Sequence, residues 1–291
     1  MITLTPSLVT MPLAALYGAV IGSFLANAAV RLPEDRSLLT PSSCPRCGAR
    51  VRWHDNVPIL SWFWLRGRCR DCGQPISPLY PLIEALTAVL AALLARHLFV
   101  SWSDLDAAHI VAWVYQLGFV SLLVVLATVD IKHRIIPNET SIYAVPFGIA
   151  GHGVLALLGY DGWWTIPPFL PLALPAWLIP PALAALAAGC FYALFWVSGA
   201  MTSWFMRKDA LGFGDVKLAA MLGSFLGPQL GVAALLASSL LSLVVGLPAR
   251  VLLWREVWTP YGPAAAVAAL GVVYFGDVPV LEMIVRSLYG A

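Results

Sequence analysis

The sequence has few charged residues. Only 11% of its 291 residues are Asp, Glu, Lys or Arg, whereas soluble domains average about a quarter. This shortage, with 60% hydrophobic residues and a mean hydropathy of +0.83, excludes an ordinary soluble domain. The alternating pattern of a membrane β-barrel is also missing, because the apolar runs are continuous. The net charge is only +2, and we expect no nucleic-acid partner.

Long apolar runs are what the sequence has in abundance. Several hold about 20 nearly uncharged residues, the length of helix that crosses roughly 30 Å of hydrocarbon. Because a lipid-exposed backbone must satisfy its own hydrogen bonds, such runs predict helices. The fold class is therefore an all-α polytopic membrane protein that lies in a lipid bilayer. We expect eight spans, at about 8–30, 79–100, 107–130, 140–160, 177–200, 211–229, 231–250 and 260–276.

The first apolar run has no Lys or Arg before it. A cleaved signal peptide carries such residues, so we expect a retained span with the N-terminus outside. The polar block 31–78 holds eight arginines, and the positive-inside rule places this block in the cytoplasm. Alternating spans then put fourteen of the 17 Lys and Arg residues on that face. The predicted organisation is a first span (1–30), a cytoplasmic domain (31–78) and a helical bundle (79–291).

Two segments resist assignment to a span. The prolines of 165–181 disfavour a regular helix, so we expect a re-entrant or interfacial piece there, and a short interfacial helix in 277–291. Small residues in "GAVIG" (18–22) and "GSFLG" (223–227) have the spacing that lets helices approach closely. We expect these glycines to pack helices and assign them no chemistry.

Cysteine is scarce, and four of the five cysteines form two CxxC pairs separated by 21 residues. Four thiolates in two such pairs are typical of a structural Zn²⁺ site. The alternatives are two disulfides, which a cytoplasmic location disfavours, or unligated thiols. His54 lies between the pairs as a further possible ligand, and Cys190 is expected to be an inert core residue. The predicted zinc ligands are Cys44, Cys47, Cys69 and Cys72.

The polar block is too small to build a hydrophobic core. Metal binding is therefore expected to supply much of its folding free energy. Its clustered aromatic residues are expected to settle the block against the membrane interface. They are Trp53, Trp62, Phe63 and Trp64.

Ionisable residues within the spans are few, and each suggests a site because charge is costly there. Asp130 ends the third span and Asp215 begins the sixth, so the topology puts both near the cytoplasmic face. Two close carboxylates share a proton, so one can act as general base on water while the other polarises a carbonyl. The sequence shows no competing Ser-His or Cys-His nucleophile. The alternative for each residue alone is a helix end in the headgroup region.

Four further residues are candidates for positioning a substrate. Gly212 and Gly214 would let the backbone before Asp215 approach an extended peptide. Lys217 is two positions from Asp215 and does not face it on a helix, so it either snorkels to the interface or binds an acidic group. Glu84 serves either as a structural hydrogen-bond acceptor or as a substrate contact.

Five motifs occur in order: "GSFLANAAVRLP", the cysteine block, "YPLIE", "DIKHRIIPN" and "GFGDVKL". Together they resemble the bacterial type IV prepilin peptidases, leader peptidases and N-methyltransferases of pilus and type II secretion systems. The resemblance implies that Asp130 and Asp215 are catalytic and that the four paired cysteines bind zinc. The family usually has Asn directly after "GSFL", where this chain has Ala26, and an acid where it has Lys132.

The resemblance also implies an activity and its partners. The family cleaves prepilins or pseudopilins after the glycine of a short basic leader, on the cytoplasmic side of the inner membrane. Members with the cysteine block also methylate the new N-terminus with S-adenosylmethionine. That second activity rests on the resemblance alone, because the sequence has no glycine-rich nucleotide loop on a βαβ unit.

Three other functions stay open at this point. A transporter could use the intramembrane acids as proton carriers, although it would give no role to the cysteine block. A non-catalytic scaffold would use that block to bind a partner. A related intramembrane protease would cut another substrate, although "DIKHRIIPN" and the cysteines favour the prepilin type.

Overall fold

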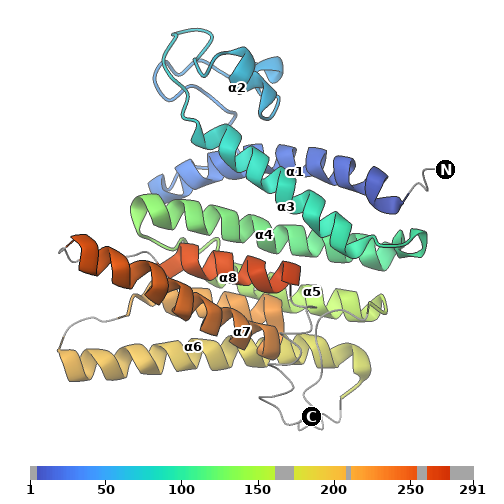
Figure 1. The fold of residues 1–291 in the computed structure, drawn as a ribbon, viewed down its shortest axis with the longest axis vertical. Coiled ribbons are helices and arrows are strands. Elements are labelled where there is room, and N and C mark those ends of the chain that lie inside the picture. Colours follow the sequence, from blue (N-terminus) through green and yellow to red (C-terminus); the bar gives the residue numbers. More distant parts are fainter. Residues whose placement is uncertain (1–4, 161–173, 208–210, 254–260, 276–291) are drawn as a thin grey trace. The chain divides into compact units, whose positions relative to one another are not determined.

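A computed structural model describes residues 5–160, 174–207, 211–253 and 261–275 (Figure 1). Throughout these ranges the regular structure is helical, apart from two isolated β-bridges, so the predicted all-α class is confirmed. The chain divides into two compact units, Met1–Val125 and Leu126–Ala291. The expectations for 165–173 and 277–291, and those for Lys208, Arg255 and Arg286, lie outside the described residues.

The first unit contains α1 (Pro6–Arg31), α3 (Leu79–Leu98) and the beginning of α4 (Ala107–His133). Helix α1 packs against α3, and its glycines make this possible. A Cβ on Gly18 would lie 2.6 Å from the Cβ of Ala91, and one on Gly22 would lie 2.7 Å from the Cα of Glu84. The prediction that "GAVIG" packs helices is therefore confirmed.

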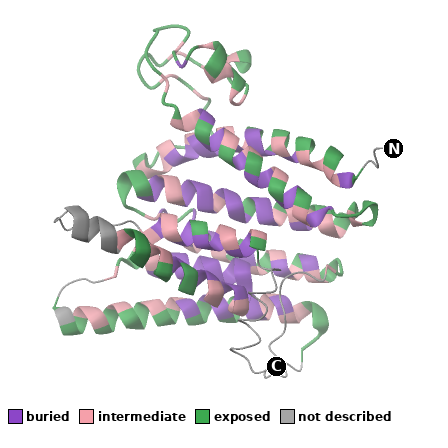
Figure 2. Cartoon of the chain, viewed as in Figure 1, coloured by how far each residue is buried: buried purple, intermediate pink, exposed green. Residues whose placement is uncertain are grey.

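Between α1 and α3 lies the cysteine block, residues 31–78, which contains the short helices η2 (Trp53–Asp55) and α2 (Leu60–Trp64). Figure 2 shows that the block is almost entirely exposed or half-buried. Gly67 is its one buried residue. As expected from its size, the block has no hydrophobic core of its own.

The second unit contains the end of α4, α5 (Val145–Leu157), α6 (Ile179–Met206), α7 (Phe213–Leu253) and α8 (Tyr261–Phe275). Helix α7 packs against α5, α6 and α8. A Cβ on Gly223 would lie 2.8 Å from the backbone of Ala187, so this glycine permits close packing. Gly227 has no such neighbour, but its φ of 70° and ψ of −173° break the helix. Of the two glycines of "GSFLG", Gly223 therefore permits close helix packing and Gly227 interrupts the helix.

Among the described residues, the helices long and apolar enough to cross a membrane are five: Pro6–Glu34, Leu79–Leu98, Ala107–His133, Ala176–Phe205 and Phe213–Gly246. Two shorter apolar helices, Ile142–Leu157 and Tyr261–Phe275, fall on the expected fourth and eighth spans. The expected sixth and seventh spans form one helix, α7, interrupted at Gly227. All eight expected spans are thus helical, although the number that meets the length criterion is five.

Candidate aspartate site and metal centre

Asp130 lies in the last turn of α4, and its side chain is only 6% exposed. Its backbone carbonyl accepts a hydrogen bond from Arg134, which ends the helix with a left-handed φ of 55°. The carboxylate oxygen Oδ2 accepts a hydrogen bond of 2.9 Å from the backbone amide of Gly262, in the first turn of α8. A buried carboxylate therefore has a partner from a second helix.

Asp215 lies in the first turn of α7 and is half-buried. Its amide donates to the carbonyl of Gly212 at 3.0 Å, so "GFGD" forms the turn that begins the helix. The first turn of a helix stabilises negative charge, because its free N–H groups and the helix dipole point at the side chain. The sequence thus places this carboxylate where its charge is best tolerated.

The second unit brings the two carboxylates together, since Asp215 lies within electrostatic range of Asp130. They are 85 positions apart in the sequence and come from the end of α4 and the start of α7. Asp130 is buried and Asp215 is half-buried. Two carboxylates that lie close together can share a proton.

The motifs "DIKHRIIPN" and "GFGDVKL" also contact each other away from the carboxylates. Lys217 donates a hydrogen bond of 2.6 Å to Oδ1 of Asn138 and lies 5.6 Å from the centre of the Phe213 ring. A Cβ on Gly214 would lie 3.2 Å from Cβ of Ile136. Lys217 and Gly214 therefore join the start of α7 to the loop after α4, and Gly212 is exposed.

Glu84 lies on α3, in the first unit. It is 7% exposed, and its Oε2 accepts a hydrogen bond of 2.6 Å from the amide of Ile59. Ile59 has a φ of 64°, which is unusual for a β-branched residue and needs support from its surroundings. Of the two expectations for Glu84, the structure contains the structural hydrogen bond, and this bond ties the cysteine block to α3.

The two CxxC pairs form matching turns. In the first turn, Cys44 donates to the carbonyl of Ala49 at 2.9 Å and accepts from Gly48 at 2.9 Å. In the second turn, Cys69 donates to Gln74 at 2.8 Å and accepts from Gly73 at 2.9 Å. Gly48 and Gly73 have φ of 74° and 69°, a conformation that glycine adopts at little cost. Each turn thereby points two sulfurs in one direction.

The four sulfurs have the chemistry and the spacing of a metal-binding site. They all lie within 4.8 Å of one another, and Cys44 Sγ is 3.9 Å from Cys72 Sγ. A tetrahedral ion with bonds of about 2.3 Å separates its sulfurs by about 3.8 Å. All four cysteines are free thiols, and hydrogen bonds from the backbone of Cys47 and Arg46 lower the pKa of Cys44 to about 7. The cluster can therefore bind a metal ion.

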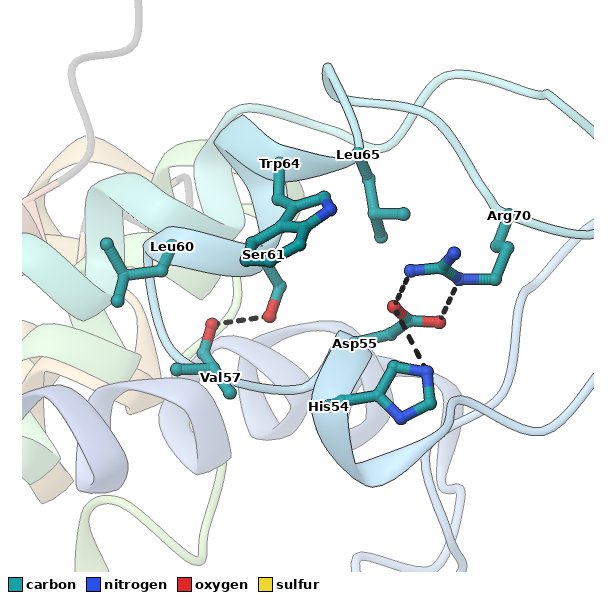
Figure 3. A pocket seen from close by; sticks show the side chains of 8 residues that line it. All are labelled: His54, Asp55, Val57, Leu60, Ser61, Trp64, Leu65 and Arg70. Carbon is teal, nitrogen blue, oxygen red and sulfur yellow. Dashed lines mark hydrogen bonds and ion pairs between the residues drawn. The ribbon is translucent and has the colours of Figure 1, made fainter.

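Arg70, between the second pair of cysteines, ties that turn to η2. Its guanidinium donates to both oxygens of Asp55, at 2.6 and 2.7 Å, and this pair lowers the pKa of Asp55. Figure 3 shows the pair at one side of a pocket of about 280 Å³ whose other walls are mainly apolar, including Leu60, Trp64 and Leu65. The pocket is at the small end for a ligand site.

The aromatic residues of the cysteine block and Cys190 of α6 differ in how far they are exposed. Trp53 and Trp64 are 85% and 83% exposed and Phe63 is exposed as well, whereas Trp62 donates from Nε1 to the carbonyl of Ile76 inside the block. Cys190 is exposed on α6. Its expected core position is therefore wrong, because an apolar side chain on a membrane helix needs no protein around it.

Several residues that contact the two aspartate motifs or lie on α8 were not singled out from the sequence. Asn138 and Ile136 lie within the "DIKHRIIPN" motif, so that motif was a signal for them. Tyr261 and Gly262 had no such signal, because a glycine near an apolar helix is common in this sequence. Only the tertiary structure shows that Gly262 contacts Asp130 and that the helix of both residues packs against α7.

The fold and these two centres define a polytopic membrane protein with a buried acidic site and a four-cysteine domain. Two protein-family models match the chain. The Bacterial Peptidase A24 N-terminal domain matches residues 16–98, and the Type IV leader peptidase family matches residues 117–247. No solved structure gives a significant match.

Curated relatives extend the similarity over most of the chain. The prepilin leader peptidase/N-methyltransferase of Aeromonas hydrophila is 31% identical over 290 residues, 90% of this chain and 89% of the relative. The type 4 prepilin-like proteins leader peptide-processing enzyme of Escherichia coli O78:H11 is 33% identical over 286 residues, 90% and 93%. The relative from Myxococcus xanthus is 36% identical over 237 residues, 79% of this chain, but the match spans 60% of that relative. The chain belongs to the type IV leader peptidase family.

Proposed function

We propose that this chain is a membrane aspartic endopeptidase that removes the leader peptide of type IV prepilins or pseudopilins. The observation that carries the proposal is the juxtaposition of Asp130 and Asp215 in the second unit of a chain of this family. The names of the relatives support the same activity. Because of the arginine-rich block, we place the active site and the cysteine domain at the cytoplasmic face of the inner membrane.

The chemistry that we propose needs only the two carboxylates and a water molecule. The ionised carboxylate takes a proton from the water, whose oxygen bonds to the carbonyl carbon of the leader's last glycine. The protonated carboxylate supplies a proton to the substrate, so the C–N bond breaks and the new N-terminus leaves as an amine. The two aspartates then share the remaining proton again.

The four further candidates have different proposed roles. Gly212 is exposed, and a Cβ there would lie 3.6 Å from Oδ2 of Asp215, so we assign it to the side where the substrate lies. Gly214 and Lys217 contact Ile136 and Asn138 instead. We therefore assign these two residues to holding the motifs together. Glu84, which supports the cysteine block, has no assigned substrate contact.

The cysteine domain and the second activity complete the proposal. Zn²⁺ is the ion that four thiolates in two such turns favour, and Cys44, Cys47, Cys69 and Cys72 would hold it. From the relatives' names we extend the function to N-methylation of the cleaved pilin, for which S-adenosylmethionine would supply the methyl group. We assign no residue of this chain to that donor.

Incubation of the purified, membrane-reconstituted protein with a type IV prepilin tests the proposal. Mass spectrometry would read loss of the leader and addition of a methyl group on the same product. We expect wild type to cleave after the glycine, and Asp130→Asn and Asp215→Asn to reduce cleavage to background, because each removes one member of the pair.

Asp106→Asn is the matched control. Asp106 is exposed, and its side chain accepts a hydrogen bond from the amide of His109 at the start of α4, a role that Asn fills equally well. This variant should cleave like wild type. Full activity in Asp215→Asn, with a folded protein, would contradict the aspartate mechanism.

A further inference from the structure

The first turn of α8 reaches the aspartate site from outside both matched families' ranges, which end at residues 98 and 247. The Gly262 amide donates to Oδ2 of Asp130 at 2.9 Å, and this hydrogen bond is buried. The two residues are 132 positions apart in the sequence. The contact therefore exists only because α8 returns to the end of α4.

This hydrogen bond compensates for the unfavourable position of Asp130. The last turn of a helix carries partial negative charge, so a carboxylate there is disfavoured by its own helix. The amides in the first turn of a helix have no acceptor within that helix, and the Gly262 amide finds its acceptor in Asp130. Pro263 follows and has no N–H to offer. The carboxylate of Asp130 thus lies at the N-terminus of α8, just as the carboxylate of Asp215 lies at the N-terminus of α7.

Space as well as charge requires a glycine at position 262. A Cβ there would lie 2.6 Å from Oδ2 of Asp130 and 3.0 Å from Cδ2 of Leu126. Contacts shorter than 3.0 Å force something to move, and the carboxylate is the nearest group. Every other residue type would therefore displace the Asp130 side chain or separate α8 from α4.

Tyr261 fastens the same turn to α7. Its hydroxyl lies 2.6 Å from Oγ of Ser238, which itself donates to the carbonyl of Leu235 at 2.8 Å. Its ring lies 6.4 Å from that of Phe195 on α6. Tyr261 is also within electrostatic range of Asp215, whereas Gly262 contacts Asp130 directly.

We propose that Tyr261 and Gly262 are positioning residues for the aspartate pair. Gly262 orients the Asp130 carboxylate through its amide, and Tyr261 keeps that amide in place by anchoring the first turn of α8 to α7. The inference rests on the proposed function, because it concerns the geometry of the same site. It adds a third chain segment to a site that the two aspartate motifs would otherwise define alone.

Steady-state cleavage of a purified prepilin by Gly262→Ala tests this role. We expect kcat to fall by about 10- to 100-fold, since a displacement of about 1 Å at an active site can cost 10²-fold. KM should stay within about twofold, because Gly262 acts on Asp130 and not on the substrate. The pH profile of kcat should also shift, since the carboxylate loses its amide partner.

The matched control is Gly271→Ala, in the same helix, where a Cβ meets nothing within 4 Å. It should match wild type in kcat, KM and thermal midpoint. Tyr261→Phe keeps the ring and removes only the hydroxyl, and it should lower kcat by about 3- to 10-fold at constant KM, a modest loss of orientation. If Gly262→Ala does not fold, the kcat of Tyr261→Phe tests the proposal instead.

Wild-type kcat in folded Gly262→Ala, or in Tyr261→Phe when Gly262→Ala is unfolded, would overturn the inference. A rise in KM with unchanged kcat would overturn it too, because it would indicate a substrate contact. These results leave the proposed function intact as long as wild type cleaves and Asp130→Asn does not. Absence of prepilin cleavage by wild type would instead defeat the proposed function itself.

Discussion

The cysteine block and the aspartate site hold their reactive side chains by opposite means. Of residues 31–78, only Gly67 is buried, whereas residues 218–227 of α7, directly after Asp215, are all buried. The block depends on individual interactions: turns closed by glycines, an Arg–Asp pair and four converging sulfurs. The aspartates depend on helices packed around them. The difference teaches that a polar site can be built either without a core or inside one.

The glycines of the cysteine block and those of the second unit also differ in why they are needed. Gly48 and Gly73 have positive φ and nothing within 4 Å of an added Cβ, so the block needs them for their backbone conformation. Gly223 and Gly262 have ordinary φ and close neighbours, so the second unit needs them for space. The same residue type therefore responds to substitution for different physical reasons in the two regions.

Removal of the proposed Zn²⁺ should have the largest effect, and only on the block. Zn²⁺ in small domains contributes about 10–16 kcal/mol of apparent binding free energy at pH 7, and the block has no core to replace it. We expect a strong chelator to make residues 31–78 sensitive to a protease while the helices stay resistant. Limited proteolysis with mass spectrometry would measure this.

Cys190→Ser is the control for that experiment, since this thiol lies outside the cluster, and it should keep both the metal and protease resistance. Cys47→Ser with Cys72→Ser should reproduce the effect of the chelator. A block that stays resistant without metal would show that its hydrogen bonds suffice, and would break the comparison.

Gly223→Ala should have the next largest effect, on the second unit. Its Cβ would lie 2.8 Å from backbone atoms of Ala187 and Ala188, which cannot rotate away. Overpacking of this kind costs about 1–3 kcal/mol, so the thermal midpoint of the helices should fall. Gly189→Ala, where the space is open, should leave it within error.

The matched substitution in the block is Gly48→Ala. There the cost of about 1–2 kcal/mol comes from the left-handed backbone, and Gly48→Asn should recover part of it because Asn tolerates that conformation. Equal losses in Gly48→Ala and Gly48→Asn would show that space is the cause in the block as well.

Asp55→Asn should have the smallest effect, and that effect should depend on pH. The Arg70 hydrogen bonds lower the folded-state pKa of Asp55. Asp55 therefore stabilises the block above its unfolded pKa of about 3.9, and this contribution disappears as pH falls through the lowered folded value. We expect a loss of about 1 kcal/mol on substitution, unchanged between pH 8 and 5, measured by tryptophan fluorescence during thermal unfolding.

Asp71→Asn serves as the comparison, because Asp71 makes only an exposed pair with Arg52 at 3.2 Å. Such pairs contribute about 0–1 kcal/mol, so this variant should be close to wild type. A loss in Asp55→Asn that is the same at about pH 2 as at pH 5 would show that the pKa is not lowered.

Sequence patterns predicted the helical fold and the cysteine cluster, and they singled out the two aspartates, because each has a local signal. Long uncharged runs need only be counted, CxxC turns are built from neighbours, and a carboxylate at the end of an apolar run stands out. The patterns did worse on Cys190, since an apolar environment on a membrane helix can be lipid as well as protein. They could not separate the two roles of Glu84, because its partner Ile59 is 25 positions away.

By itself, the sequence determined which segments are helical and which four sulfurs converge, and it singled out Asp130 and Asp215 as acidic residues at the ends of apolar runs, because these properties follow from composition and spacing within each segment. The tertiary structure decided how the carboxylates are held. Lys217 binds Asn138, Gly214 faces Ile136 and Gly262 donates to Asp130 because separate helices pack together. Space and hydrogen-bond geometry across such contacts have no local pattern, so only the folded chain shows them.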